Sequence, residues 1–315
     1  MEYNKWVAEM EAGDDVEGFY ILKSAQIRTS NTGKTFLAGS IADRSGTMEI
    51  KIWDYAGPLG TPDEGGVVKL RGSISEYRGA PQLIVSRIRL AEEGDSYSLG
   101  ELVPTAPIDA SASWQELLGL VESIRDPDYR AVCQEILQQN GILFQQLPGG
   151  KSVHHSFLNG LLMHTLYMAR TAVFFAELYQ EVVDRDLLLA GTVLHDVAKC
   201  REFVTSPLGL VTEYSVPGEL LGHLVMGAQA VAETAKALGM PEEKSLLLQH
   251  LILSHHGEPD FGAAVRPMCA EAELLYLIDL ADSRMEIYKE NLEETDVGTF
   301  TKRIFALDKK IYRHR

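Results

Sequence analysis

The hydrophobic pattern of this 315-residue chain changes once along its length, from a strand-like to a helical period. Residues 18–90 contain five short segments rich in β-branched and aromatic residues, separated by turn signals such as Asn31-Thr32-Gly33. From Trp114 onward, apolar residues recur with a helical period instead. A chain of 315 residues also has room for about two domains. We therefore predict a multidomain protein in which an all-β domain precedes an all-α domain.

The strand-like region predicts a small closed barrel. In segment 47–53 (TMEIKIW) apolar and polar residues alternate, which places Trp53 on the same face as Glu49 and Lys51. Five short strands in about 75 residues suggest a barrel, and the OB-fold is the commonest small barrel that binds oligonucleotides. A helical piece is expected near 54–60, where OB-folds often carry one. We expect the strands at 19–28, 35–42, 47–53, 67–77 and 82–90.

The rest of the chain divides into a linker and a helical bundle. Residues 91–112 are rich in small residues, Pro and acids and lack periodicity. We predict an OB-fold nucleic-acid-binding domain at 1–95, a linker at 96–112, and an all-α domain at 113–315 with an amphipathic C-terminal tail. A short loop or hairpin is expected within 201–217. We expect helices at 113–124, 127–140, 156–180, 184–199, 218–238, 241–256 and 270–290.

The charge distribution indicates where a polyanion would bind. The net charge of -16 argues against a protein that simply coats nucleic acid, because phosphate binding depends on Lys and Arg. Residues 18–90, however, hold ten basic and six acidic residues, a local charge of +4. Aromatic side chains on an OB surface can stack bases, so Tyr55 is one candidate for nucleic-acid binding. Each aromatic candidate could instead fill the core, because small barrels need large residues there. The other candidates on the barrel are Lys34, Phe36, Lys51, Trp53, Tyr77 and Arg78.

The composition predicts a cytoplasmic protein that does not contact a membrane. No apolar run reaches the ~20 residues that a membrane span needs. The N-terminal sequence MEYNKWVAEMEAGDD is acidic and polar, unlike a secretory signal or a transit peptide. Cys133, Cys200 and Cys269 are widely spaced and include no CxxC pair. They predict neither a disulfide framework nor a cysteine zinc site.

Eight of the nine histidines lie between residues 154 and 256, within the helical region. The gaps from His164 to His195, His223 and His255 are each roughly one helix and one connection long. A helical bundle can therefore bring one ligand from each of several helices to a common point, as metal sites in bundles do. Imidazole and carboxylate ligands without thiols suit manganese, iron, zinc or magnesium.

Segment 186–199 (DLLLAGTVLHDVAK) is an apolar helix that ends in His195, Asp196 and Lys199. A buried carboxylate is costly unless it is paired or binds a cation. The alternative is a hydrogen-bonded His–Asp pair with Lys199 at a helix C-terminus. His255 and His256 could likewise be surface or capping residues, and His223 a core histidine. Taken together, the set favours a metal site over a series of structural histidines.

These residues resemble the His…His-Asp…Asp pattern of the HD-domain superfamily of phosphohydrolases, and the additional histidines resemble its dinuclear variant. The resemblance implies that Asp196 bridges two metal ions. In YLIDLADSRM, the family's Asp-x-x-Asp form favours Asp279 over Asp282 as the closing ligand. The implied metal ligands are His164, His195, Asp196, His223, His255, His256 and Asp279.

Nearly the whole chain is similar to the YhaM-type 3'-5' exoribonucleases, through segments such as VHHSFLNGLLMHT, GHLVMG, LILSHHG and TKRIFALDKKIY. That resemblance implies manganese as the cofactor, with iron, zinc, magnesium or cobalt as alternatives, and a dinuclear metal-hydroxide attack on phosphodiester bonds. The substrate would be single-stranded RNA, with DNA as an alternative. The catalytic residues would be Asp196, Lys199, His154 and His155, with Lys199 stabilising charge on the phosphate. His154 and His155 could contact the substrate phosphate or protonate the leaving oxygen, or they could be a pair of exposed loop histidines.

Two other functions stay open at this point. One is an HD phosphohydrolase that acts on a small nucleotide or a cyclic dinucleotide, with the barrel as a regulatory domain. The other is a non-catalytic nucleic-acid-binding protein that keeps the metal site for stability. Whether the chain assembles into a homo-oligomer also stays open.

Overall fold

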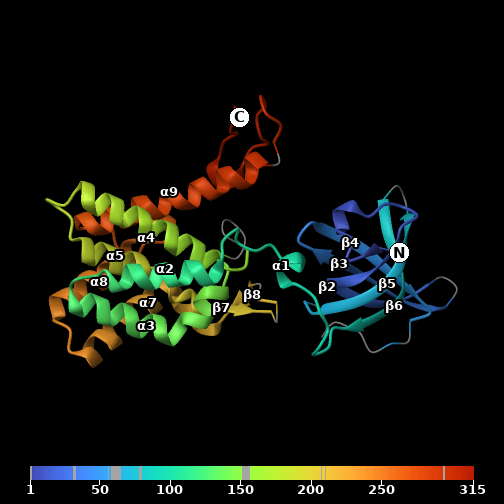
Figure 1. The fold of residues 1–315 in the computed structure, drawn as a ribbon, viewed down its shortest axis with the longest axis horizontal. Coiled ribbons are helices and arrows are strands. Elements are labelled where there is room, and N and C mark those ends of the chain that lie inside the picture. The colour runs from blue at the N-terminus through green and yellow to red at the C-terminus, as the bar shows by residue number, and fades with distance from the viewer. Residues whose placement is uncertain are drawn as a thin grey trace. The chain divides into compact units, whose positions relative to one another are not determined.

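The computed structural model describes residues 2–30, 33–55, 57, 65–77, 80–150, 157–206, 208–209, 211–293 and 295–315. The chain divides into two units (Figure 1). The first comprises Met1–Thr105 and Ser206–Leu208, and the second comprises Ala106–Thr205 and Gly209–Arg315.

The first unit is a closed five-strand barrel. Antiparallel pairing joins β2 to β3, β3 to β4, β5 to β6 and β5 back to β2, whereas β4 and β6 pair in parallel. This connectivity is that of an OB-fold, so the predicted fold and its five strands are confirmed. A two-residue strand, β1 (Glu2–Tyr3), the 3-10 turn η1 (Val7–Glu9) and the short helix α1 (Leu99–Leu102) accompany the barrel. Its strands are β2 (Asp15–Thr29), β3 (Thr35–Asp43), β4 (Gly46–Trp53), β5 (Val67–Tyr77) and β6 (Ala80–Leu90).

Barrel closure depends on glycine where strands approach closely. A Cβ atom on Gly72 would lie 2.3 Å from the carbonyl oxygen of Ile84, at the point where the register between β5 and β6 shifts. Inside the barrel, the alternation in β4 is as expected, because Met48, Ile50 and Ile52 are buried. Tyr55 is also buried in this core, so its proposal as a base-stacking residue is wrong. The helical piece expected near 54–60 falls mostly on residues outside the described ones.

The second unit is a bundle of helices (Figure 1). Aspartate side chains start three of its helices: Asp109, Asp126 and Asp184 each accept backbone N–H groups of the first turn. α1 and the start of α2 occupy part of 96–112, where we expected a linker without periodicity. A two-stranded hairpin, β7 (Phe203–Thr205) and β8 (Val211–Tyr214), lies in the segment predicted to hold one. The helices are α2 (Ala110–Glu122), α3 (Pro127–Gln146), α4 (Gly160–Leu178), α5 (Arg185–Leu194), α6 (Lys199–Glu202), α7 (Val216–Leu238), α8 (Glu242–Ser254) and α9 (Ala270–Glu293), with a 3-10 turn at η3 (Pro259–Phe261).

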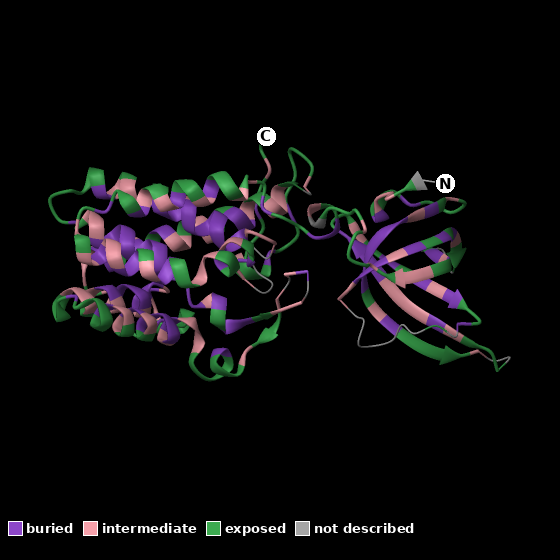
Figure 2. Ribbon diagram, turned by 60° about the horizontal axis from the view of Figure 1, so that its bottom comes forward, coloured by how far each residue is buried: buried purple, intermediate pink, exposed green. Residues whose placement is uncertain are grey.

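Helix α5 forms the centre of this unit, because every residue from Leu187 to Leu194 is buried. Buried residues fill the interior of the bundle and the inward faces of the barrel strands (Figure 2). Among the described residues, no helix combines the length and the apolar character that a membrane crossing requires.

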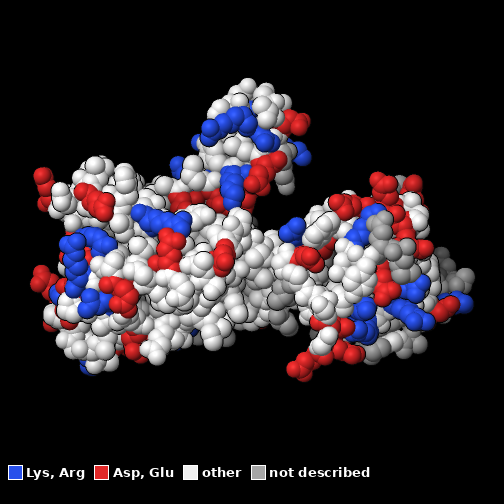
Figure 3. All heavy atoms as spheres, in the orientation of Figure 1, with Lys and Arg blue, Asp and Glu red and all other residues white. Residues whose placement is uncertain are grey.

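The C-terminal tail folds onto the end of α9. Ile304 and Ile311 pack against Ile287 of that helix, and Phe300 pairs with Tyr312 across an irregular hairpin that contains the 3-10 turn η4 (Phe305–Leu307). Lys and Arg side chains gather on the visible face of this segment (Figure 3). The expected amphipathic tail with a basic end is therefore present.

Candidate metal centre and nucleic-acid surface

Five helices bring ionisable side chains to one end of α5. His164 lies in α4, and His195 and Asp196 directly follow the last residue of α5. His223 lies in α7 and Asp279 in α9, while His255 and His256 follow α8. His164, His195, Asp196 and His255 are buried. Their donor atoms form two groups.

The first group surrounds the Nε2 atom of His164. This atom lies 3.3 Å from Nε2 of His195, 3.4 Å from Oδ1 of Asp279 and 3.8 Å from Oδ2 of Asp196. The Oδ2 atom of Asp196 is also 3.2 Å from Nε2 of His195. Two imidazole nitrogens and two carboxylate oxygens therefore converge, as a hard or borderline divalent cation requires.

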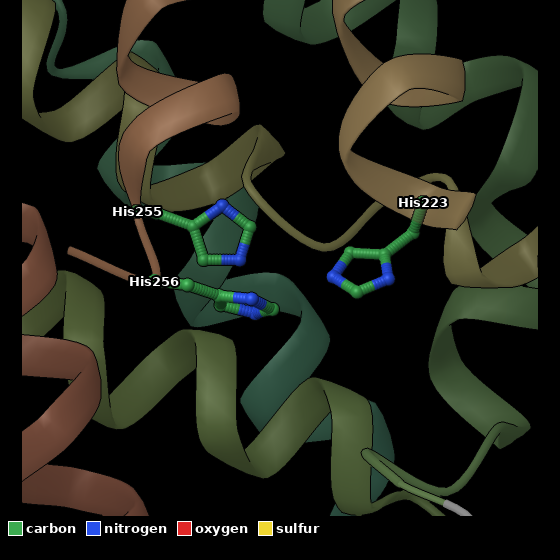
Figure 4. Close-up of side chains that lie close together, drawn as sticks. All are labelled: His223, His255 and His256. Atoms are coloured by element: carbon green, nitrogen blue, oxygen red, sulfur yellow. The ribbon is translucent and has the colours of Figure 1, made fainter. Parts of the chain in front are cut away.

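The second group of donor atoms surrounds Oδ1, the other carboxylate oxygen of Asp196. Its Oδ1 atom is 3.4 Å from Nε2 of His223 and 3.8 Å from Nε2 of His255. His223, His255 and His256 each offer a nitrogen, and these nitrogens lie within 4.8 Å of one another. Figure 4 shows the ring of His223 facing those of His255 and His256. Asp196 therefore directs one oxygen toward each group.

Outer partners hold the ring nitrogens of both groups in place. The Nδ1 atom of His195 lies 2.7 Å from the carbonyl oxygen of Thr192, and that of His255 lies 2.7 Å from the carbonyl oxygen of Ile252. A carbonyl oxygen can only accept a hydrogen bond, so Nδ1 of each ring must carry the hydrogen. Nε2 of each ring is therefore an acceptor, and it points inward. Such partners are the usual way in which proteins orient metal-binding histidines.

Asp282 differs from Asp279 in the side of His164 that it contacts. Asp282 lies 2.7 Å from Nδ1, the outer nitrogen of that ring, whereas Asp279 faces the inner nitrogen. The two aspartates are three residues apart on α9, so both reach the same ring from one helix face. Asp282 therefore has the geometry of an orienting residue, and Asp279 that of a ligand.

A break in α7 directs His223 toward the site. Gly222 has φ 70° and ψ 164°, a conformation that essentially only glycine adopts. The break leaves the backbone N–H of His223 without its helical acceptor, and Oε1 of Glu202 accepts that N–H at 2.9 Å. The same oxygen lies 3.1 Å from Nδ1 of His223. Sequence reasoning missed Glu202, which lies on the four-residue helix α6.

The donor set fits divalent cations. Five buried polar side-chain atoms have no hydrogen-bond partner among the described residues, and four of them belong to this site: Asp196 Oδ1, His223 Nε2, His255 Nε2 and His256 Nδ1. A buried polar atom without a partner costs about 1–3 kcal/mol. A cation bound at these atoms would remove that cost.

The electrostatic environment keeps Asp196 and His255 in their cation-binding forms. Burial raises the pKa of Asp196, but the charge of Lys199 and the interaction with His195 hold it well below its usual value. Burial lowers the pKa of His255 well below its usual value, and His195 and His256 lower it further. Burial also lowers the pKa of His164, but hydrogen bonds to Asp279 and Asp282 raise it to about 10 in the absence of a cation.

Lys199 lies at the wall of a hollow of about 380 Å³ beside both groups. Its ammonium donates hydrogen bonds to Oδ2 of Asp196 at 2.7 Å and to the carbonyl oxygen of Gly149 at 2.6 Å. Burial lowers the pKa of Lys199, but Asp196 more than offsets this effect and raises it. Among the described residues, the hollow is lined by three carboxylates, Asp196, Glu202 and Asp279, and by one ammonium, that of Lys199. His154 and His155 lie outside the described residues.

Four of the residues proposed for nucleic-acid binding meet on one face of the barrel. Phe36, Lys51, Trp53 and Tyr77 form what we call the aromatic platform. The ammonium of Lys51 lies 5.1, 4.5 and 5.3 Å from the ring centroids of Phe36, Trp53 and Tyr77. Trp53 and Tyr77 are 51% and 48% exposed, which leaves their rings accessible to a ligand.

The other two proposed contacts are Lys34 and Arg78. Lys34 is exposed and lies 3.2 Å from the Asp54 carboxylate, and Arg78 lies outside the described residues.

Comparison with known proteins gives matches over nearly the whole chain. Residues 161–283 match the HD domain. The chain is 35% identical over 309 residues to the "3'-5' exoribonuclease YhaM" of Bacillus licheniformis, covering 96% of this chain and 95% of that protein. It is 32% identical over 311 residues to the protein of the same name from a Geobacillus species, covering 98% of this chain and 94% of that protein. Among solved structures, the second OB-fold domain of replication protein A from Methanococcus maripaludis covers 30% of this chain and 100% of its own, with a TM-score of 0.25 and 12% identity.

Proposed function

The chain belongs to the family of the YhaM 3'-5' exoribonucleases, and from that premise we propose that it removes nucleotides one at a time from the 3' end of single-stranded RNA. Two divalent cations, manganese first among the candidates, serve this reaction. His164, His195, Asp196 and Asp279 hold the first cation. Asp196, His223, His255 and His256 hold the second.

The observation that carries this proposal is the placement of Asp196 between two sets of donors. A single carboxylate with each oxygen directed at a different set is suited to bridge two cations. Its pKa is held well below its usual value, so the group is a carboxylate at neutral pH. When bound, divalent cations polarise a phosphate oxygen and make water a stronger nucleophile at neutral pH.

The remaining residues of the site orient the metal-binding histidines and stabilise charge on the substrate. The Lys199 ammonium has three N–H donors and gives two of them to Asp196 and Gly149. The third N–H is available to a phosphate oxygen in the adjoining hollow, where it stabilises charge that develops during the reaction. Glu202 and Asp282 hold His223 and His164 in place. His154 and His155, which lie outside the described residues, are kept as the residues that would contact the substrate phosphate or protonate the leaving oxygen.

The aromatic platform supports a single strand as the substrate. Stacking on aromatic side chains contributes about 1–3 kcal/mol per base and needs no particular sequence. Lys51, at the centre of three rings, supplies a positive charge for the backbone. In this division of labour the barrel supplies affinity for the strand, and the helical unit supplies the chemistry.

A 5'-labelled single-stranded RNA 20-mer incubated with the protein and manganese tests the proposal. The expected product is a ladder that shortens by single nucleotides from the 3' end and disappears when EDTA is added. The same experiment with DNA of equal sequence measures the sugar preference. Turnover of nucleotides or cyclic dinucleotides without any ladder would favour a small-nucleotide phosphohydrolase. RNA binding without turnover would favour a non-catalytic protein.

A further inference from the structure

Two like-charged pairs of residues lie opposite each other on the outer face of β5 and β6. Lys69 is in register with Arg89, and Arg71 is in register with Arg87. We call these four residues the basic strip. Like charges directly opposite each other destabilise a sheet. The stability of the barrel therefore does not explain why these four residues are basic. None of its members was among the residues expected to bind nucleic acid.

The central pair of the strip is exposed and has no carboxylate partner among the described residues. At the ends of the strip, Lys69 lies 3.7 Å from the Glu17 carboxylate and Arg89 lies 2.6 Å from that of Asp95. Arg71 and Arg87 are exposed and form no ion pair with any residue that the structure describes. Glu17 is in register with Arg71 on its other side, but its carboxylate contacts Lys69.

The strip lines a hollow that leads toward the aromatic platform. The four basic residues share a hollow of about 700 Å³ with Glu17, its one carboxylate, among the described residues. A neighbouring hollow of about 410 Å³ is lined by both Arg71 and Trp53. Lys and Arg side chains lie over the part of the barrel where β5 and β6 run (Figure 3). A strand stacked on Trp53 therefore has a continuous path to Arg71.

We propose that the basic strip binds the phosphate backbone of the single-stranded RNA beyond the bases that stack on the aromatic platform. The identity of the strand rests on the proposed function. Phosphate contacts position the backbone of a strand, whereas the platform stacks its bases without sequence preference, so the two surfaces have separate roles. Bound phosphates also neutralise the like charges of Arg71 and Arg87, which accounts for a pair that the fold alone disfavours.

The salt dependence of RNA binding separates the two surfaces. For single strands the slope of log K against log salt changes by about 0.7 for each phosphate contact. The variant Arg71→Gln/Arg87→Gln should reduce the slope by about 1.4, and either single variant by about half of that. Trp53→Ala should weaken binding without changing the slope. Fluorescence anisotropy of a labelled RNA 20-mer, in EDTA to prevent cleavage, measures both quantities on the full chain.

Matched controls make the test specific. Lys23→Gln/Arg44→Gln removes the same net charge from exposed residues that line neither hollow, and should leave the slope unchanged. The melting temperature of Arg71→Gln/Arg87→Gln should be equal to or above that of the wild type, because a repulsive pair is removed. Arg71→Lys/Arg87→Lys should keep the slope, since the charge is kept.

Two results would overturn the proposal: a wild-type slope in Arg71→Gln/Arg87→Gln, or an equal loss of slope in the control pair. Hydrolysis of bis-p-nitrophenyl phosphate with manganese, which needs no strand contact, should stay at the wild-type rate in Arg71→Gln/Arg87→Gln. A wild-type protein that binds RNA but makes no ladder would defeat the proposed function, and the slopes would still decide whether the strip binds phosphates.

Discussion

The Oε1 atom of Glu202 accepts the backbone N–H of His223 at 2.9 Å and lies 3.1 Å from Nδ1 of the same residue. One buried carboxylate oxygen thus satisfies the N–H that the break at Gly222 exposes and also fixes the ring. Because Nδ1 is engaged, Nε2 of His223 faces Asp196. Glu202 is therefore part of the support for the second group of donors.

Replacement of Glu202 should weaken manganese binding at the second group. Glu202→Ala removes both contacts to His223, and loss of an outer partner typically lowers metal affinity about 10–100-fold. Glu202→Gln, whose amide oxygen can still accept, should show a smaller effect. Titration calorimetry with manganese measures the affinity, with Glu213→Gln as an exposed control on β8. Wild-type affinity for both cations in Glu202→Ala would contradict this assignment.

The two aspartates of α9 should respond differently to substitution. Asp279 faces the inner nitrogen of His164, so Asp279→Asn should abolish tight binding of the first cation. Asp282 contacts the outer nitrogen, so Asp282→Asn should lower manganese affinity about 10–100-fold and keep the stoichiometry. Each variant is the other's control, since both remove one carboxylate from the same helix. The reverse pattern in metal analysis would make Asp282 the ligand.

Lys199 should affect turnover more than metal content. Lys199→Ala removes the donor that we assign to the phosphate, which should lower kcat by about 10²-fold or more at saturating manganese. Because Lys199 is bonded to Asp196 and Gly149, the metal-free variant should also melt at a lower temperature, with bound manganese reversing part of that loss. A variant that melts lower but retains wild-type kcat would show that Lys199 is a structural residue.

Removal of the exposed ring of Trp53 should lower affinity for RNA. Loss of one stacked base weakens binding by about 1–3 kcal/mol. Trp53→Ala should therefore raise the Kd for RNA by roughly 5–150-fold. Its kcat at saturating RNA should be unchanged. Tyr97→Ala is a suitable control, because the ring of Tyr97 packs against that of Phe19 and takes no part in the platform. An unchanged Kd in Trp53→Ala would exclude the platform from binding.

Much of the fold can be predicted from the local sequence pattern. The remaining features depend on long-range geometry, which the local pattern does not reveal. The predicted strand 67–77 coincides with β5 (Val67–Tyr77), because alternation over eleven residues is a strong signal. The histidine spacing indicated that several helices would contribute donors to one point. Glu202 could not be predicted, because its role depends on a break in another helix. Arg71 and Arg87 meet only through strand register, and Tyr55 is buried because it packs into the barrel core.

Metal stoichiometry in variants of Asp196 and His223 tests the central claim, that one carboxylate serves two cations. After equilibration with manganese and removal of excess ion, elemental analysis of the wild type should give two manganese ions per chain. His223→Ala should keep one, because the first group is intact. Asp196→Ala, which loses the carboxylate that we propose to serve both cations, should hold none, and it should be folded by circular dichroism. Full manganese occupancy in folded Asp196→Ala would contradict the account.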